Sequence, residues 1–123
     1  MKLVNLCSHD ITILIDNKPT VIDDEGHLAR YQWRVTGEET LPNGIRVLEK
    51  RAFAKGLPHE REGVLYVVSS TLQGAFPERK DLLSPCMHGA MKYQNGPQSG
   101  QIAGIKFLQR FNKGGTSGQD WKI

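Results

Sequence analysis

Apolar and polar positions alternate along much of this chain, and the alternation predicts strands. In the clearest case every odd-numbered position from Ala29 to Val35 is apolar, while Arg30, Gln32 and Arg34 fall between them. Side chains at i and i+2 of a strand project from one face, so this spacing is typical of a strand with one apolar face. Weaker patterns predict further strands at residues 2–6, 11–15, 20–22, 45–53, 86–93 and 101–111.

The most continuous apolar run is residues 64–69, Val-Leu-Tyr-Val-Val-Ser. Its apolar residues occupy both parities, which predicts a strand that is covered on both faces. The stretch then passes through Ser69 and Ser70 toward Pro77. We expect Ser70 to cap a single short helical turn over residues 71–76, ended by the proline. No other segment predicts a helix.

Turn-forming residues separate these elements. Asp-Asn-Lys-Pro at 16–19 predicts the turn of an N-terminal hairpin, and residues 37–44 and 95–100 read as polar connections. The sum is about seven short strands with at most one short helix, hence a mainly β fold, either a small antiparallel barrel or a curled sheet. Residues 1–112 form a single predicted β-rich domain. Residues 113–123, which contain three glycines, form a predicted flexible C-terminal tail.

Composition narrows the function classes. The 123 residues suit one domain, and 16 Lys and Arg against 13 Asp and Glu give a net charge of +3. The positive residues are spread along the chain, so we expect an anionic ligand to be tolerated but no specific nucleic acid. No apolar run reaches the roughly 20 residues of a membrane span, and residues 3–6 are too short for a signal peptide. The prediction is a cytoplasmic protein whose Cys7 and Cys86 are thiols.

A metal site is one hypothesis, because Cys7-Ser8-His9 and Cys86-Met87-His88 repeat the pattern Cys-x-His. Two such pairs brought together on strands would offer two thiolates and two imidazoles. Structural zinc sites favour two to four residues between ligands, however, and the spacing here is one. Buried thiols beside polar histidines are the favoured interpretation, and we expect neither a metal nor another cofactor.

Nucleophilic catalysis is a second hypothesis, with Ser69 or Ser70 as nucleophile, His9 as base, and Asp81 or Asp10 as the orienting carboxylate. The sequence contains no Gly-x-Ser-x-Gly, and two serines after a strand are more typical of a turn or a helix cap. We therefore expect that the protein is not an enzyme.

Anion binding is the best supported of the three. Arginine offers a planar fork that matches phosphate or carboxylate oxygens in pairs, and aromatic rings can stack on a base. For any single arginine, a solvated strand face with surface salt bridges is the competing interpretation. The basic candidates are Arg30, Arg34, Arg79, Lys80, Lys106 and Arg110, and the aromatic candidates are Tyr31, Phe76 and Tyr93.

The opening of the chain, Lys-Leu-Val-Asn-Leu-Cys-Ser-His-Asp-Ile, resembles a family of small proteins from bacteriophages, prophages and actinobacteria. Members open with Lys-Leu-Val-Asn-Leu-Thr-Pro-His before an isoleucine strand, so Asn5 and His9 match while Cys7-Ser8 replaces Thr-Pro. The resemblance covers most of residues 1–108. It includes Ala29-Arg30, Gly56-Leu57-Pro58, Tyr66-Val67-Val68-Ser69 and Arg79-Lys80-Asp81-Leu82, and Lys92 keeps the basic residue of the family's Val-Arg-Asp.

The resemblance implies a phage-type genome and action in the cytoplasm of a bacterial host. The leading hypothesis is a counter-defence protein that sequesters a small anionic, nucleotide-derived immune signal, for example a cyclic ADP-ribose species, without chemistry. A domain this small forms a deep pocket more easily between subunits, so we expect a homo-oligomer. The predicted phosphate contacts are Arg30, Arg79 and Lys92, and the predicted polar contacts are Asn5, His9, Ser69 and Asp81.

Two other functions stay open. One is a protein-binding inhibitor that masks a host defence enzyme through an exposed strand edge or an apolar patch. The other, ranked third, is a small hydrolase or another enzyme. The chemical state of a ligand recovered from the denatured protein separates binding from turnover, and a stoichiometric protein partner indicates the inhibitor.

Overall fold

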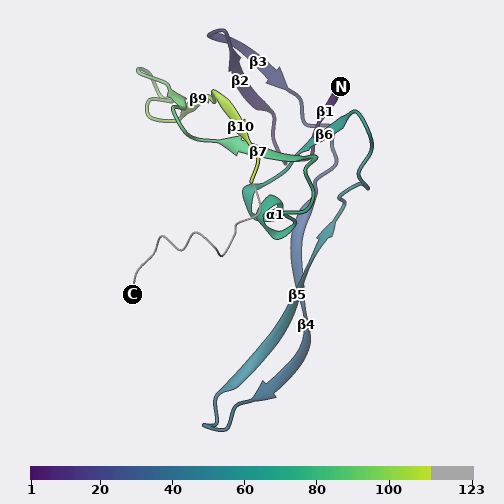
Figure 1. The fold of residues 1–123 in the computed structure, drawn as a ribbon. Coiled ribbons are helices and arrows are strands. Elements are labelled where there is room, and N and C mark those ends of the chain that lie inside the picture. Colours follow the sequence, from purple (N-terminus) through teal and green to yellow (C-terminus); the bar gives the residue numbers. More distant parts are fainter. Residues whose placement is uncertain (112–123) are drawn as a thin grey trace, which may run out of the picture.

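The computed structural model describes residues 1–111, which are built around a curled four-stranded sheet (Figure 1). Strands β1, β6 and β7 run parallel to one another, and β10 is antiparallel to β7. The predicted mainly β class and the curled sheet are confirmed, and none of the described sheets closes into a barrel. In sheet order the strands are β1 (Lys2–Asn5), β6 (Val64–Val67), β7 (Leu82–Cys86) and β10 (Phe107–Gln109).

The pairing in this sheet is mixed, whereas the sequence had predicted antiparallel pairing. Parallel neighbours need a long connection that returns the chain to the starting edge. The chain between β1 and β6 supplies one by forming two hairpins, and the short helix α1 (Ser70–Ala75) lies in the connection from β6 to β7. The three parallel strands consequently end at the same edge of the sheet.

Three two-stranded hairpins complete the described chain: β2 (Ile11–Ile15) with β3 (Lys18–Ile22), β4 (Arg30–Thr40) with β5 (Arg46–Lys55), and β8 (Met91–Lys92) with β9 (Ile102–Gly104). The first is the predicted N-terminal hairpin. Its turn residues, Asp16 and Asn17, have φ angles of 51° and 63°. Two positive φ values are what a tight two-residue hairpin turn requires, and Asp and Asn tolerate them better than most residues.

Several strand boundaries differ from the prediction. The expected polar connection over 37–44 is shorter, because β4 continues to Thr40 beyond a bulge between Val35 and Gly37. The segment expected as one strand over 101–111 divides into β9 and β10, since Ile105 exchanges backbone hydrogen bonds with Thr12 and Leu14 of β2 at 2.9 and 2.8 Å. The predicted strand over 86–93 instead comprises the end of β7, a turn and β8. The described chain therefore has more strands than expected, and β4 is longer than its predicted pattern while β8, β9 and β10 are shorter.

Strand β6 is buried on both faces, as its apolar run predicted. Tyr66 and Val68 pack in a core cluster on one side of the sheet, while Val67 packs in a second cluster on the other side. The first cluster includes Val4, Leu6, Ala29, Leu72 and Leu82. The second includes Cys7, Ile11 and Ile105.

The predicted helix is confirmed, but its cap is Ser69 rather than Ser70. The Ser69 hydroxyl accepts a hydrogen bond from the backbone N–H of Leu72 at 3.2 Å, and Ser70 is the first helical residue. Leu72 is fully buried in the first core cluster, so its position fixes the helix register. The preceding hydroxyl that can reach its N–H is then three residues earlier, which is the usual N-cap spacing.

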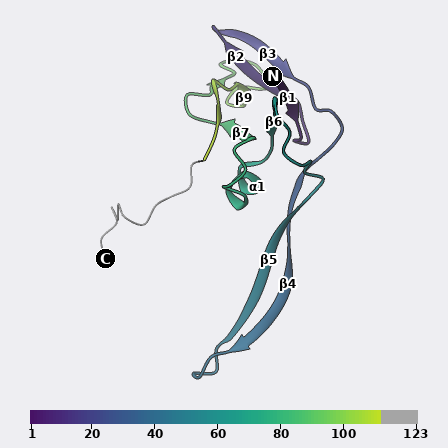
Figure 2. The same ribbon diagram turned by 45° about the vertical axis from the view of Figure 1, so that its right-hand side comes forward.

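The hairpin of β4 and β5, called the arm from here on, extends away from the rest of the described chain as a long twisted ribbon (Figures 1 and 2). It spans residues 30–55. The tail predicted for residues 113–123 lies outside the described residues. Among residues 1–111, no helix is long and apolar enough to cross a membrane.

Candidate functional site

The carboxyl edge of the parallel strands brings two of the predicted site residues together. His9 follows β1 and Ser69 follows β6, and both line a hollow of about 350 Å³. A neighbouring hollow of about 340 Å³ shares His9, Pro85 and Met87 with the first. Ligands of open parallel sheets commonly bind at this edge. Among the described residues, however, no Lys or Arg lines either hollow, so neither offers a cation to a phosphate.

The contacts of Ser69 and His9 are structural. Ser69 caps α1, and His9 Nδ1 lies 3.0 Å from the backbone carbonyl oxygen of Asp10. Asp81, one of the two carboxylates considered for a catalytic triad, is held by Arg79 instead. A triad needs a carboxylate that orients the imidazole toward the nucleophile. The observed contacts join neither His9 to a carboxylate nor Ser69 to His9.

Asn5 is fully buried and organises the loop after β1. Its Nδ2 donates to the carbonyl oxygens of His9 and Ile22 at 3.0 and 2.9 Å, and its Oδ1 accepts from the N–H of Cys7 at 2.9 Å. Both N–H bonds of the amide are used within the protein. The residue therefore fixes where His9 lies.

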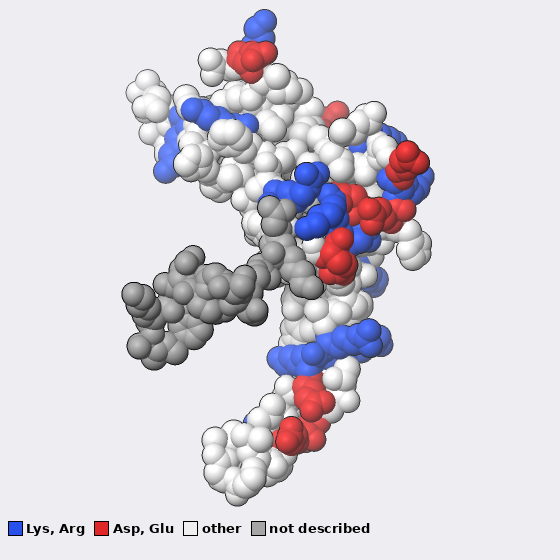
Figure 3. Space-filling view, viewed as in Figure 1, with Lys and Arg blue, Asp and Glu red and all other residues white. Residues whose placement is uncertain are grey.

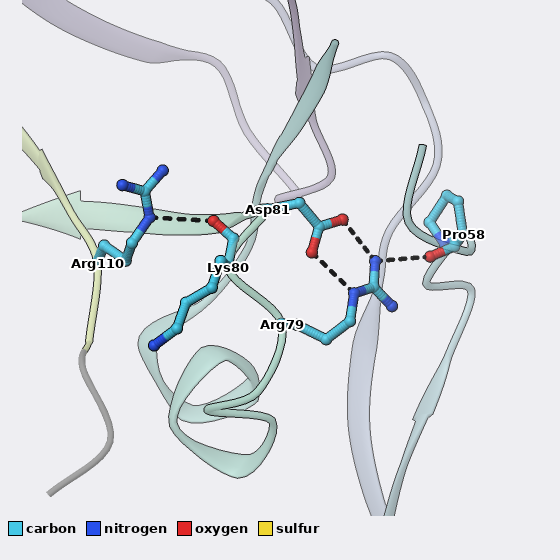
Figure 4. Close-up of polar contacts among 5 residues, drawn as sticks. All are labelled: Pro58, Arg79, Lys80, Asp81 and Arg110. Atoms are coloured by element: carbon cyan, nitrogen blue, oxygen red, sulfur yellow. Dashed lines mark hydrogen bonds and ion pairs between the residues drawn. The ribbon is translucent and has the colours of Figure 1, made fainter. Parts of the chain in front are cut away.

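Arg79 and Asp81 form a two-pronged ion pair in which the carboxylate is buried and the guanidinium is partly buried (Figure 4). Arg79 Nε and Nη2 donate to the two carboxylate oxygens at 2.8 and 2.7 Å, and Nη2 also donates to the carbonyl oxygen of Pro58 at 2.9 Å. The side chains are 19% and 5% exposed. The hydrogen bond to Asp81 raises the pKa of Arg79, so the guanidinium is held charged. The guanidinium of Arg79 was predicted to bind a phosphate. It binds Asp81 instead and holds the loop at Pro58 through a hydrogen bond.

The other two predicted phosphate contacts lie apart from these hollows. Arg30 is exposed at the root of the arm, opposite Lys55, and Lys92 is exposed in β8, opposite Ile102. Neither lines the hollows beside His9. The structure thus gathers only His9 and Ser69 of the seven predicted residues into one hollow, and it joins Arg79 to Asp81.

A larger groove lies along one face of β1 and is called the β1 groove. Its volume is about 790 Å³, and its floor is formed by Val4 of β1, Leu6 just after β1, and Tyr66 of β6. Alternate side chains of a strand share a face, which places Lys2 in the same row as Val4 and Leu6. The walls are two loop segments, residues 25–28 and residues 56–61.

The two walls meet closely at Gly56. Its φ angle is 84°, and a Cβ atom there would lie 2.8 Å from the carbonyl oxygen of Leu28. Glycine is therefore required both by the backbone conformation and by the contact. Behind the second wall, Arg79 donates to the carbonyl oxygen of Pro58, so the Arg79–Asp81 pair positions a segment that lines the groove.

The groove gathers basic and imidazole side chains around its apolar floor. Lys2, His27, His59 and Arg61 line it, with Glu25 as the acidic member. Tyr66, also in the lining, is 2% exposed, and its hydroxyl has no hydrogen-bond partner among residues 1–111. Buried hydroxyls are normally paired with protein or water, so this one is an exception, and it has no exposed surface through which a ligand in the groove could reach it.

The two cysteines do not form a metal centre in the described chain. Both are free thiols, as predicted, and residues 1–111 contain no group of three or more His, Cys, Asp or Glu side chains placed to hold a metal ion. Cys7 is buried, and its thiol donates to the carbonyl oxygen of Val67 at 3.7 Å. Burial, aided by the negative charge of Asp24, raises the pKa of the Cys7 thiol. Metals and electrophiles react with the thiolate, which this environment disfavours.

The sequence had not pointed to the β1 groove. His59 and Arg61 fall in a stretch that reads as a solvated surface loop, and Tyr66 reads as part of a buried strand. The alternation of Lys2, Val4 and Leu6 was a usable signal for one side of the groove. Nothing in the sequence placed the loops at 25–28 and 56–61 on either side of that row.

Comparisons with known proteins do not indicate a function for this chain. No family model, no curated protein and no solved structure matches the chain.

Proposed function

We propose that this protein is a binding protein that holds a small anionic ligand in the β1 groove without chemical conversion. The observation that carries the proposal is the lining of the groove, where Lys2, Arg61 and two imidazoles surround an apolar floor. Its volume of about 790 Å³ falls within the roughly 300–1,000 Å³ of small-molecule sites. Lys2 and Arg61 supply charge-assisted donors for phosphate or carboxylate oxygens.

The same lining favours a ligand with one flat apolar part and one anionic part. Leu28 is exposed in the lining and offers apolar surface for a ring, and an imidazole of His27 or His59 can stack on that ring or donate to an oxygen. A nucleotide combines these two parts. The proposed ligand class is therefore nucleotide-derived, such as a cyclic ADP-ribose species, and the proposed role is sequestration of such a signal in phage counter-defence.

Binding without chemistry is supported by the kinds of side chain in the groove. Among its described lining residues there is no Ser, Thr or Cys to act as a nucleophile. The predicted contacts Arg79 and Asp81 take a different role in this proposal, because they hold the wall at Pro58 rather than the ligand.

Titration calorimetry with cyclic ADP-ribose, ADP-ribose and AMP tests the proposal. We expect heat with at least one of these probes, and a loss of affinity of about tenfold or more in Arg61→Ala and in Lys2→Ala, since each removes a charge-assisted contact. Lys18→Ala is the matched control, because Lys18 is exposed on β3 and outside the groove lining. Mass spectrometry of the ligand released by heat should find it unchanged.

Two results would contradict the proposal. One is the absence of heat with all three probes, and the other is recovery of a converted product, which indicates an enzyme. The alternative of a protein-binding inhibitor would use the arm, whose Trp33 and Val35 are each 51% exposed. Recovery of a stoichiometric host enzyme on the wild-type chain, lost in Trp33→Ser, would favour that alternative.

A further inference from the structure

Beyond its root the arm stands apart from the other described elements (Figure 2), and the apolar side chains on one of its faces are exposed. The strand register places Tyr31 opposite Ala54 and Trp33 opposite Ala52, and directly opposed residues share a face. Leu48 continues this face beyond the bulge, and Tyr31, Trp33 and Leu48 are all exposed. An isolated hairpin is only marginally stable in water, and a continuous exposed apolar stripe marks an interaction surface.

Charge changes sign along the arm. Figure 3 shows a band of Lys and Arg across the arm and acidic side chains between that band and the tip. The half near the body holds Arg30, Arg34, Lys50, Arg51 and Lys55, and the half near the tip holds Glu38, Glu39 and Glu49 with Arg46.

Three charges, Lys50, Arg46 and Glu38, lie on the apolar face itself, and the other charged side chains of the arm alternate onto the opposite face. Lys50 Nζ lies 3.6 Å from the ring centroid of Trp33, and Glu38 pairs with Arg46 near the tip. Lys50 is opposite Val35 and Glu38 is opposite Leu48, so the two charges are neighbours along this face.

We propose that a second copy of this chain covers the apolar face, with the two arms packed antiparallel about a two-fold axis. A two-fold axis presents the same surface from both copies. Antiparallel arms then set Lys50 of each copy against the Glu38–Arg46 pair of the other, and they lay the mainly basic half of each arm along the mainly acidic half of its partner. Parallel arms would set like charges together. Tyr31 and Trp33 supply the aromatic anchors that protein interfaces favour.

A nucleic acid fits the arm less well than a second copy does. Its basic half and its two aromatic side chains suit a phosphate backbone and stacked bases. The end that reaches farthest from the body, however, carries Glu38 and Glu39, which would repel phosphates. A partner with alternating charge satisfies both halves of the arm.

Reciprocal charge reversal tests this arrangement by sedimentation velocity. The wild type should form a dimer, and Lys50→Glu or Glu38→Lys alone should raise the dimer dissociation constant about tenfold or more, because like charges then meet twice per dimer. Co-expression of the two variants should restore a heterodimer, since each reversed charge meets its opposite. Trp33→Ser should weaken the dimer regardless of charge.

Lys18→Glu is the matched control, with the same charge change on an exposed residue outside the arm, and it should dimerise like the wild type. Circular dichroism verifies that every variant is folded. A wild type that stays monomeric overturns the proposal, as does a dimer that neither charge reversal weakens. Retardation of duplex DNA by a monomeric wild type overturns it in favour of a nucleic-acid partner. Ligand binding in the β1 groove of Trp33→Ser is a separate readout, so failure of the dimer and failure of the proposed function are distinguishable.

Discussion

The hydroxyl of Tyr66 lowers the stability of the folded protein, whereas its buried ring does not. It is buried without a hydrogen-bond partner among residues 1–111, and an unsatisfied buried hydroxyl loses its bonds to water. We therefore expect Tyr66→Phe to raise the free energy of unfolding by about 1 kcal/mol. The same change should leave ligand binding in the β1 groove unchanged, since the hydroxyl has no surface exposed to the groove.

Urea denaturation measures the stability change, and Tyr31→Phe on the exposed arm is the control that should leave stability unchanged. If Tyr66→Phe lowers stability by a comparable amount instead, the hydroxyl has a partner in solution. A loss of ligand affinity in Tyr66→Phe would contradict the assigned burial of the hydroxyl.

The Arg79–Asp81 pair should be costly to break from one side. Asp81→Ala leaves a partly buried guanidinium without its carboxylate, so we expect a loss of about 2 kcal/mol in the free energy of unfolding. The double variant Arg79→Met/Asp81→Ala should recover part of this loss, because no uncompensated charge then remains.

The exposed Glu38–Arg46 pair is the control for this cycle, since its side chains are largely accessible. Glu38→Ala, measured in the monomer, should cost no more than about 1 kcal/mol. Equal losses at the two pairs would show that burial does not govern the strength of the Arg79–Asp81 pair.

The Cys7 thiol should be slow to alkylate and should make stability depend on alkaline pH. Burial raises its pKa in the folded state, so the unfolded chain releases this proton at a lower pH than the folded chain does. The free energy of unfolding is then unaffected below the ordinary thiol pKa. It falls as the pH rises from that value through the higher pKa of the folded state. Peptide mass spectrometry after brief iodoacetamide treatment at mildly alkaline pH should find Cys7 less modified than Cys86, which is half-buried.

Cys7→Ser should remove the alkaline decrease in stability that this thiol causes. Denaturation before alkylation provides the second control, because both thiols should then react equally. Faster modification of Cys7 than of Cys86 in the folded protein would contradict the assigned environment.

At the scale of elements, Gln73 ties the helix to two strands of the sheet. Its Nε2 donates to the carbonyl oxygens of Leu82 and Gln109, both at 2.9 Å, and its Oε1 accepts from the hydroxyl of Ser84. Gln109 Nε2 in turn donates to Ser84 Oγ at 3.1 Å. The helix of six residues is too short to be stable alone, so these bonds and the packing of Leu72 hold it in place.

Gln73→Leu keeps the side-chain size but leaves these partners unpaired, and we expect a loss of about 3 kcal/mol in stability. Amide hydrogen exchange should accelerate in β10 more than in β6, because β10 is the outer strand that Gln73 secures. Gln101→Leu, at an exposed position, is the control and should change stability little. Unchanged exchange in β10 would show that its pairing with β7 suffices.

At the scale of the whole molecule, the arm should be an appendage to an independently stable body. Ala54 at its root packs against the first core cluster, whereas the arm beyond Trp33 contributes no residue to either cluster. Trp33 and Ala52 are directly opposed, so an Asn-Gly turn can join them in place of residues 34–51. We expect the free energy of unfolding of this shortened chain to lie within about 1 kcal/mol of that of the monomeric wild type.

Thermal and urea unfolding measure that difference, and the shortened chain should also stay monomeric while keeping ligand binding in the β1 groove. A large loss of stability would mean that the distal arm supports the body directly. Retained dimerisation would place the subunit interface elsewhere.

The sequence alone determined the features that depend on local spacing. Period-two alternation located most strands, two residues that accept positive φ located the first hairpin turn, and a serine before Leu72 located the helix to within one residue. The apolar run at 64–69 predicted a strand buried on both faces, because its residues are apolar at both odd and even positions. The predicted strand over 101–111 was wrong at Ile105, because the backbone of Ile105 pairs with β2 and divides the segment into two strands.

Only the tertiary structure decided which polar residues meet. Arg79 and Asp81 lie two residues apart, and their spacing did not reveal whether they would bind a ligand or each other. In the folded chain they lie beside Pro58 and pair with each other. The β1 groove joins residues 2–6, 25–28 and 56–66 of the chain, whose approach depends on parallel pairing of β1 with β6 and on the close contact at Gly56. Pairing partners across such distances follow from the packing of the whole core, which no local pattern specifies.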